Sequence, residues 1–182
     1  MKKAFVMVLL FLVTFSFAFS RNIFDIAKDG TPEEMRAAIE AGADIEARDK
    51  GGFTPLYVAA QNNKNPDVVA ALIKAGANVN VRTEGGFTPL HGAAFKNTNP
   101  EVVTALVKVG ADVTARAEGG FTPLHVAAGF NKNPEVIIKL LELGANPKAK
   151  TSAGKTPWDD IQENEALKNT KAYWALNETR YE

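Results

Sequence analysis

The chain has 182 residues, of which 46% are hydrophobic and 23% charged, a balance typical of a soluble folded protein that can bury a sizeable core. Its formal net charge is zero, so no overall positive field indicates a nucleic-acid partner. The absence of cysteine excludes disulfides, thiolate metal sites, iron–sulfur clusters and cysteine nucleophiles.

The first 20 residues have the pattern of a secretory signal peptide. Residues 4–19 are uncharged and follow two lysines, and the small residues Ala18 and Ser20 suit a cleavage site. We expect cleavage after Ser20; cleavage after Ala18 and retention as a membrane anchor are the alternatives. The pattern predicts an exported protein, either periplasmic or secreted.

Behind this segment, a unit of 34 residues repeats in tandem. The string Gly-Phe-Thr-Pro-Leu begins at positions 52, 86 and 120, with a weaker echo at 154. Each unit predicts two short helices: threonine caps the first, proline is its first residue, and glycine ends the second. These repeat positions are Thr54, Pro55, Thr88, Pro89, Thr122 and Pro123, with Gly76, Gly110 and Gly144.

The second helix of each unit begins with Asn-Pro and an acidic residue, as in residues 65–67. Valine, leucine and isoleucine then recur on one face, which a single unit cannot bury alone. Stacked units bury these faces between neighbours, so the sequence predicts an all-α solenoid. The end units differ: residues 22–48 carry Glu34 at an apolar position, and residues 151–182 lack the closing glycine. Both therefore look like caps.

At these residues the chain resembles the ankyrin-repeat family. Thr-Pro-Leu-His, a pair of alanines, Glu-Val-Val and Gly-Ala-Asp follow in order from Thr88, and most of the pattern recurs from Thr122. The usual unit is about 33 residues, one fewer than here, and Tyr57 replaces one histidine of the motif. The resemblance covers about residues 22–177.

The resemblance implies an L-shaped stack of helix-turn-helix repeats with projecting hairpin loops. In such proteins the concave side, made of the hairpins and first helices, usually holds a protein partner. The repeat domain would occupy residues 21–182: a capping repeat at 22–48, full repeats at 49–82, 83–116 and 117–150, and a closing capping repeat at 151–182.

Three sets of residues are candidates for binding a partner. A phenylalanine precedes each Thr-Pro, and an exposed row of such rings would bind protein, whereas rings lying on their neighbours would only seal the hairpins. Basic residues at the end of each unit line up across the stack. They would form a positive ridge for an acidic partner, unless nearby glutamates pair with them. A third set varies near the end of the first helix, where variation suits specificity, whereas a turn also tolerates any residue. The sets are Phe53, Phe87 and Phe121; Arg48, Arg82, Arg116 and Lys150, with Glu84 and Glu118 nearby; and Gln61, Phe95 and Phe130.

No catalytic, cofactor or metal site can be recognised. His91 and His125 occupy equivalent positions, and the resemblance implies that their rings tie adjacent loops, whereas a zinc site would need three or four ligands. We therefore expect a monomeric, non-enzymatic scaffold that binds a protein, without cofactor, metal or nucleic acid, and contacts a membrane only through an uncleaved signal. The alternatives are a structural or self-assembling envelope protein and, less favoured, an enzyme built on repeats.

Overall fold

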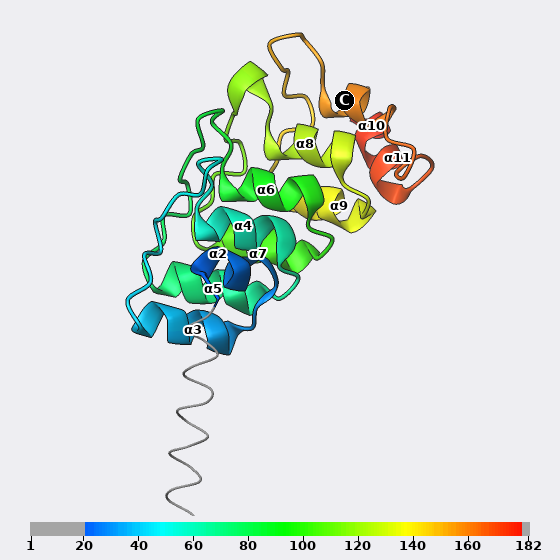
Figure 1. Ribbon diagram of the computed structural model, residues 1–182. Helices are drawn as coiled ribbons and strands as arrows, with labels where there is room; N and C mark the ends of the chain where they lie inside the picture. The colour runs from blue at the N-terminus through cyan, green and yellow to red at the C-terminus, as the bar shows by residue number, and fades with distance from the viewer. Residues whose placement is uncertain (1–20, 180–182) are drawn as a thin grey trace, which may run out of the picture.

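The computed structural model describes residues 21–179, and the predicted signal segment lies outside them. The described residues form ten α-helices in two layers and contain no strand (Figure 1). The inner layer is α2 (Ile23–Asp29), α4 (Pro55–Asn62), α6 (Pro89–Lys96), α8 (Pro123–Phe130) and α10 (Pro157–Ile161). The outer layer is α3 (Pro32–Glu40), α5 (Pro66–Lys74), α7 (Pro100–Lys108), α9 (Pro134–Glu142) and α11 (Lys171–Glu178).

Each helix packs against the equivalent helix of the neighbouring unit, so the predicted all-α solenoid is confirmed. The loops from each outer helix to the next inner helix form hairpins that project to one side of the stack (Figure 1). One of them contains a single 3-10 turn, η1 (Glu118–Gly120). Within residues 21–179, none of the helices has the length and apolar character needed to cross a bilayer.

The predicted helix ends are also confirmed. The Thr54 hydroxyl accepts a hydrogen bond from the Tyr57 N–H at 3.3 Å, and the Asn99 side chain accepts from the Glu101 N–H at 3.0 Å. Gly110 has a φ of 99°, which lets the next N–H bond back to the Leu106 carbonyl at 3.0 Å and close the helix.

The core runs along the stack between the two layers. Each full unit contributes a fully buried leucine from its inner helix, such as Leu90, and another from its outer helix, such as Leu106. The paired alanines of the inner helices are also fully buried and let neighbouring helices approach closely. Burying a leucine side chain contributes roughly 1.5–3 kcal/mol, so this column is a main source of stability.

A ladder of buried asparagines, which we call the asparagine ladder, joins the units inside the stack. The Asn97 amide donates to the carbonyls of Ala60 at 2.8 Å and Asn63 at 2.7 Å, both in the preceding unit. Its side-chain oxygen accepts from the Asn99 N–H at 2.9 Å, so every polar atom of this buried amide group has a partner. Equivalent bonds are made by Asn63, Asn131 and Asn164.

The ladder has distinct ends. The first unit has Gly30 in place of asparagine, and its carbonyl accepts from the Asn63 amide at 3.0 Å. In the last unit, the Asn164 carbonyl accepts from the Leu167 N–H at 3.0 Å within the same unit. These differences distinguish the two end units from the three between them.

Candidate binding groove

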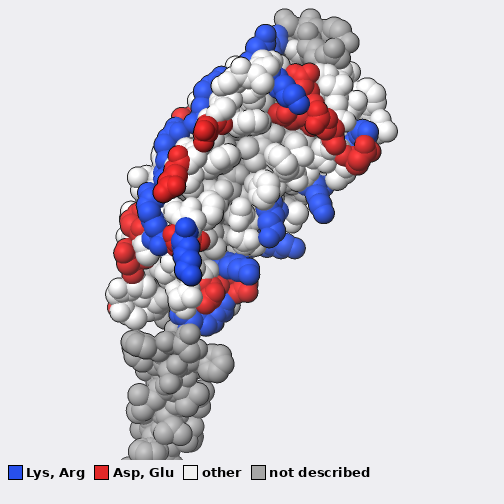
Figure 2. Space-filling model, turned by 45° about the horizontal axis from the view of Figure 1, so that its top comes forward, with Lys and Arg blue, Asp and Glu red and all other residues white. Residues whose placement is uncertain are grey.

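The hairpins and the inner helices border one face of the stack (Figure 1). Figure 2 shows that charged side chains gather along the edges of the visible face, whereas uncharged residues fill its centre. Two cavities lie along the hairpins and inner helices, one of about 350 Å³ and one of about 540 Å³. We call them the first and second cavities.

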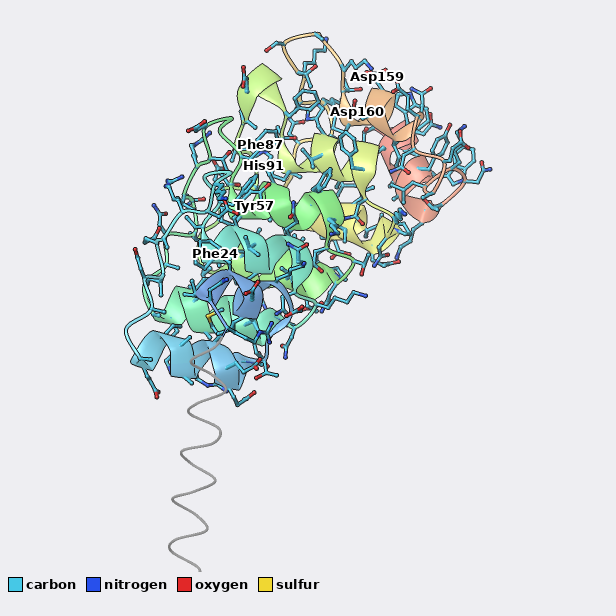
Figure 3. All side chains as sticks on the ribbon, viewed as in Figure 1. Phe24, Tyr57, Phe87, His91, Asp159 and Asp160 are labelled. Carbon is cyan, nitrogen blue, oxygen red and sulfur yellow. The ribbon has the colours of Figure 1, made fainter. Side chains whose placement is uncertain are left out.

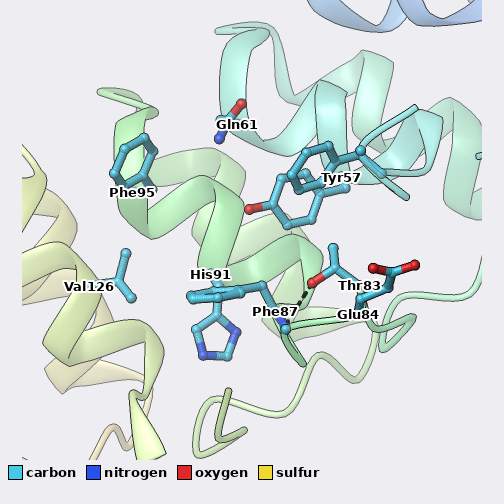
Figure 4. Close-up of a pocket in the computed structure, with 11 residues that line it drawn as sticks. Tyr57, Gln61, Thr83, Glu84, Phe87, His91, Phe95 and Val126 are labelled. Carbon is cyan, nitrogen blue, oxygen red and sulfur yellow. Dashed lines mark hydrogen bonds between the residues drawn. The ribbon is translucent and has the colours of Figure 1, made fainter. Parts of the chain in front are cut away.

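The first cavity lies between the hairpins that precede α4 and α6, and its walls are mainly aromatic (Figure 4). Tyr57 and Phe87 lie on one side and Phe95 on another, and the Tyr57 hydroxyl points into the space between them. The cavity thus brings together members of two of the predicted sets. Its lining includes Phe53, Phe87, Gln61 and Phe95, together with Tyr57, Thr83, Glu84, His91 and Val126.

The second cavity lies beside α8 and α10. It contains Phe121 and Phe130 from the predicted sets, and its remaining side chains are more polar than those of the first cavity. Lys155 forms an ion pair with Glu163 at 3.2 Å, and Asp160 faces the same cavity.

Phe95 and Phe130 form an exposed aromatic pair between the two cavities. Their ring centroids are 5.4 Å apart, and the residues are 42% and 61% exposed. Phe95 lines the first cavity and Phe130 lines the second. Both lie in the last turn of their inner helices, where the sequence placed this set. The pair therefore lies between the two cavities, and we call the two cavities together with this pair the groove.

The phenylalanine row is half-buried rather than exposed. Each ring packs against the side chain four residues later in its own unit: Phe53 on Tyr57, Phe87 on His91 and Phe121 on His125, with centroid distances of 4.6, 5.5 and 6.1 Å. The rings thus support the residues that hold the hairpins and still present an edge to the groove. Their contribution to binding stays a prediction.

The arginine column ties consecutive hairpins together. The Arg82 guanidinium donates to the carbonyls of Gly86 at 3.2 Å and Arg116 at 2.8 Å, and Arg48 and Arg116 make equivalent bonds. Among the described residues these arginines form no ion pair with Glu84 or Glu118, so the local pairing that the sequence suggested is wrong. The guanidinium groups bond instead to carbonyl oxygens of the hairpins. The basic ridge toward a partner stays a prediction.

The two histidines are buried and tie the loops, as the resemblance implied. His91 Nδ1 accepts from the Thr88 N–H at 3.2 Å, and Nε2–H donates to the Phe121 carbonyl at 3.1 Å; His125 does the same toward Lys155. Burial lowers the pKa of His91 to about 4 and also lowers that of His125. Within residues 21–179, no three histidine, aspartate or glutamate side chains are placed to hold a metal ion.

Sequence reasoning missed Asp160, which lies near the end of the row of labelled residues that climbs the inner helices in Figure 3. It stands one 34-residue step after Val126, at a position that is apolar or glycine in the full units. Its Oδ2 atom is buried and lacks a hydrogen-bond partner among the described residues. Burial raises the pKa of Asp160 to about 6. The sequence could have indicated this residue, because an acidic side chain stands where the full units have valine or glycine.

Sequence reasoning also missed the pairing of Tyr57 with Gly92. A Cβ atom at Gly92 would lie 3.2 Å from Tyr57 Cζ, so the tyrosine ring occupies space that a side chain would otherwise take. The equivalent positions in the adjoining units are Val58 and Val126. Tyr57 replaces the histidine of the other full units, and Gly92 replaces their valine. These two departures in neighbouring units could have indicated the contact.

Comparison with known proteins agrees with this architecture. A family model described as ankyrin repeats in three copies matches residues 23–83 and 63–151. No curated protein matches the chain. The matched segments overlap, cover more than half of the chain, and include the helices and hairpins that form the first cavity. The chain therefore belongs to the ankyrin-repeat family.

Proposed function

We propose that this protein is a non-catalytic scaffold that binds a partner protein along its concave groove, outside the cytoplasm. Ankyrin repeats generally mediate protein–protein interaction, and the family is typically non-enzymatic. The observation that carries the proposed binding face is the exposed pair of Phe95 and Phe130 between the two cavities.

This pair differs from the repeated columns in having no evident structural task. The arginines, histidines and asparagines of the repeat each bond to the next or the preceding unit. Phe95 and Phe130, by contrast, do not recur at the repeat step, and much of their surface is exposed. Aromatic side chains at the centre of an interface are frequent hot spots, whose removal costs 2 kcal/mol or more, roughly thirtyfold in affinity.

The proposed site of action rests on the N-terminal sequence pattern. Processing can be measured directly by mass spectrometry of the intact protein from the cells that make it. A mature chain that begins at Arg21 or Phe19 supports export with cleavage, and a retained Met1 in the membrane fraction supports an anchor. A full-length chain found only in the cytoplasm would contradict the proposal.

The binding face can be tested by photo-crosslinking in the same cells. A photoreactive phenylalanine analogue at position 95 or 130 is expected to capture a partner protein. The matched control is position 174, where Trp174 is 49% exposed on the outer helix α11. Purified protein would then be compared with the variant Phe95→Ala/Phe130→Ala, with Trp174→Ala as the control.

We expect crosslinks from positions 95 and 130 but not from 174, and a loss of affinity of at least thirtyfold in the double variant. Circular dichroism would check that both variants remain folded. Equal crosslinking at all three positions, or unchanged affinity in the folded double variant, would rule out this face. Crosslinks to a second copy of the chain would favour self-assembly instead.

A further inference from the structure

The three joints between consecutive hairpins are not held equally. The joint between hairpins 83–88 and 117–122 has three ties: Glu118 N–H to the Gly85 carbonyl at 2.8 Å, His91 to Phe121, and Arg82 to Arg116. The joint that follows has the same three, with Ser152 N–H donating to the Gly119 carbonyl at 2.8 Å.

The joint between hairpins 49–54 and 83–88, which we call the first joint, retains only the arginine tie. Tyr57 stands where the other two full units have histidine, so no imidazole reaches the Phe87 carbonyl. Within the described part of the chain, the Gly51 carbonyl and the Glu84 N–H also make no hydrogen bond. The first cavity opens at this joint, with Gly51 and Glu84 in its lining.

A tyrosine hydroxyl points into the same space. Tyr57 is 7% exposed, and burial raises the pKa of its hydroxyl. This hydroxyl points into the first cavity (Figure 4) and has no hydrogen-bond partner among residues 21–179. Because this hydroxyl borders the open cavity, an occupant that supplies an acceptor can bond to it in place of solvent. The first joint thus offers three groups to an occupant: the Tyr57 hydroxyl, the Glu84 N–H as a donor and the Gly51 carbonyl as an acceptor.

The charge of the first cavity indicates which charge its occupant should carry. Glu84 is the one carboxylate in the lining of the first cavity, and His91 there is neutral at physiological pH because of its lowered pKa. The remaining walls are aromatic or uncharged, and the Arg48 guanidinium of the same joint lies outside the lining, on the carbonyls of Gly52 and Arg82. In the second cavity Lys155 is paired with Glu163, so Asp160 leaves an excess negative charge there as well. A segment that combines apolar and basic side chains therefore complements this groove.

We propose that the first joint receives an extended segment of the partner protein. A bulky apolar side chain fills the first cavity, the backbone bonds to Gly51 and Glu84 in place of the missing hairpin tie, and an adjacent lysine or arginine lies opposite the Glu84 carboxylate. A carbonyl of the segment accepts from the Tyr57 hydroxyl. This inference rests on the proposed function and specifies the chemistry of the partner.

The test uses the protein as cells process it, labelled with ¹⁵N, and three synthetic peptides. The probe is acetyl-Ser-Lys-Phe-Lys-Ser-amide; one control replaces both lysines by glutamate, and the other replaces phenylalanine by serine. We expect the probe, at millimolar concentration, to shift the amide signals of Gly51 and Glu84. Both control peptides should bind at least about threefold more weakly, because each lacks a complementary contact.

Variants of the protein then test the individual contacts. Tyr57→Phe removes only the hydroxyl and should weaken the probe by about threefold to tenfold. Tyr57→His restores the residue of the other full units and should close the joint, with a loss of at least tenfold. Tyr173→Phe is the matched control, because this tyrosine packs against Trp158 away from the first cavity. Amide spectra of all three would verify the fold.

Three results would overturn the inference: no shift at millimolar probe, shifts confined to residues outside the first joint, or equal binding to the wild type and to folded Tyr57→Phe and Tyr57→His. These results differ from a failure of the proposed function. If a partner is crosslinked at positions 95 and 130 but its affinity is unchanged in both Tyr57 variants, the partner binds the groove but does not insert into the first joint.

Discussion

The Nε2–H of His91 donates to the carbonyl oxygen of Phe121 at 3.1 Å, so a single buried imidazole joins two consecutive hairpins. Its Nδ1 accepts from the Thr88 N–H at 3.2 Å. One ring nitrogen donates and the other accepts, and only the neutral imidazole can do both. Protonation would therefore remove the acceptor for the Thr88 N–H and place a charge in the core.

This arrangement predicts a loss of stability in mild acid. The pKa of His91 falls from 6.5 in the unfolded chain to about 4 in the folded one, so the unfolded chain takes up the proton first. Stability is fully present above pH 6.5 and declines as the pH falls toward 4, by a total on the order of 3 kcal/mol. Urea unfolding across this range would measure the decline.

The control for this prediction is the imidazole resonance of each histidine, followed by NMR in the folded protein. With only two histidines in the chain, the signals can be assigned by substituting one of them. A folded-state titration of His91 near its ordinary pKa of 6.5 would contradict the assignment.

Restoring the missing tie at the first joint is expected to stabilise the protein. Tyr57→His would place an Nε2–H within reach of the Phe87 carbonyl, as His91 does for Phe121, and should add about 1 kcal/mol, or roughly 2–4 °C in melting temperature. Tyr57→Phe is the control, because it removes the hydroxyl without supplying a tie. Thermal unfolding that ranks Tyr57→His below Tyr57→Phe would argue against a loosened joint.

The asparagine ladder should be sensitive to truncation. Asn97→Ala leaves the buried carbonyls of Ala60 and Asn63 and the Asn99 N–H without this partner, and is expected to cost about 3 kcal/mol. The control Asn146→Ala changes an exposed asparagine and should cost less than about 1 kcal/mol. Chemical denaturation measures both changes. Equal effects would show that the ladder contributes little.

Asp160→Asn should stabilise the protein at neutral pH by about 1 kcal/mol, because it removes the charge from a partly buried group with an unpartnered oxygen. The folded-state pKa of Asp160 is raised to about 6, so its carboxyl group becomes neutral in the fold as the pH falls below that value. The advantage of the variant should therefore shrink toward pH 4.5. Asp67→Asn, at an exposed helix start, is the control and should be slightly destabilising throughout.

Most of the fold could be predicted because its determinants are local and repeated. Thr54 and Pro55 specify a helix start, Gly110 specifies a helix end, and the step of 34 residues places equivalent faces against one another. The loop-tying histidines followed from the family resemblance. The asparagine ladder repeats at the same step at Asn63, Asn97 and Asn131, but a polar turn suggests solvent, and only the stacking of turns reveals that these side chains are buried.

The groove was predicted less completely, because it depends on contacts between units. Phe87 stands in a repeated row, but how much of its ring is exposed depends on His91 beneath it. Tyr57 was recognised only as a departure from the motif, and its effect appears once Gly92 of the next unit lies against its ring. Asp160 occupies the column of Val126, and its missing partner becomes evident only after α10 packs on α8.

The asparagine ladder also changes at both ends of the described stack. At one end Gly30 has no side-chain amide to offer to a preceding unit, and at the other the Asn164 carbonyl is already occupied by Leu167. Repeat stacks that present an unfinished end can grow by joining head to tail, and such growth yields open filaments. A second copy stacked head to tail would bring Gly30, which has no side-chain amide, against the last unit, so the ladder would not continue across that contact.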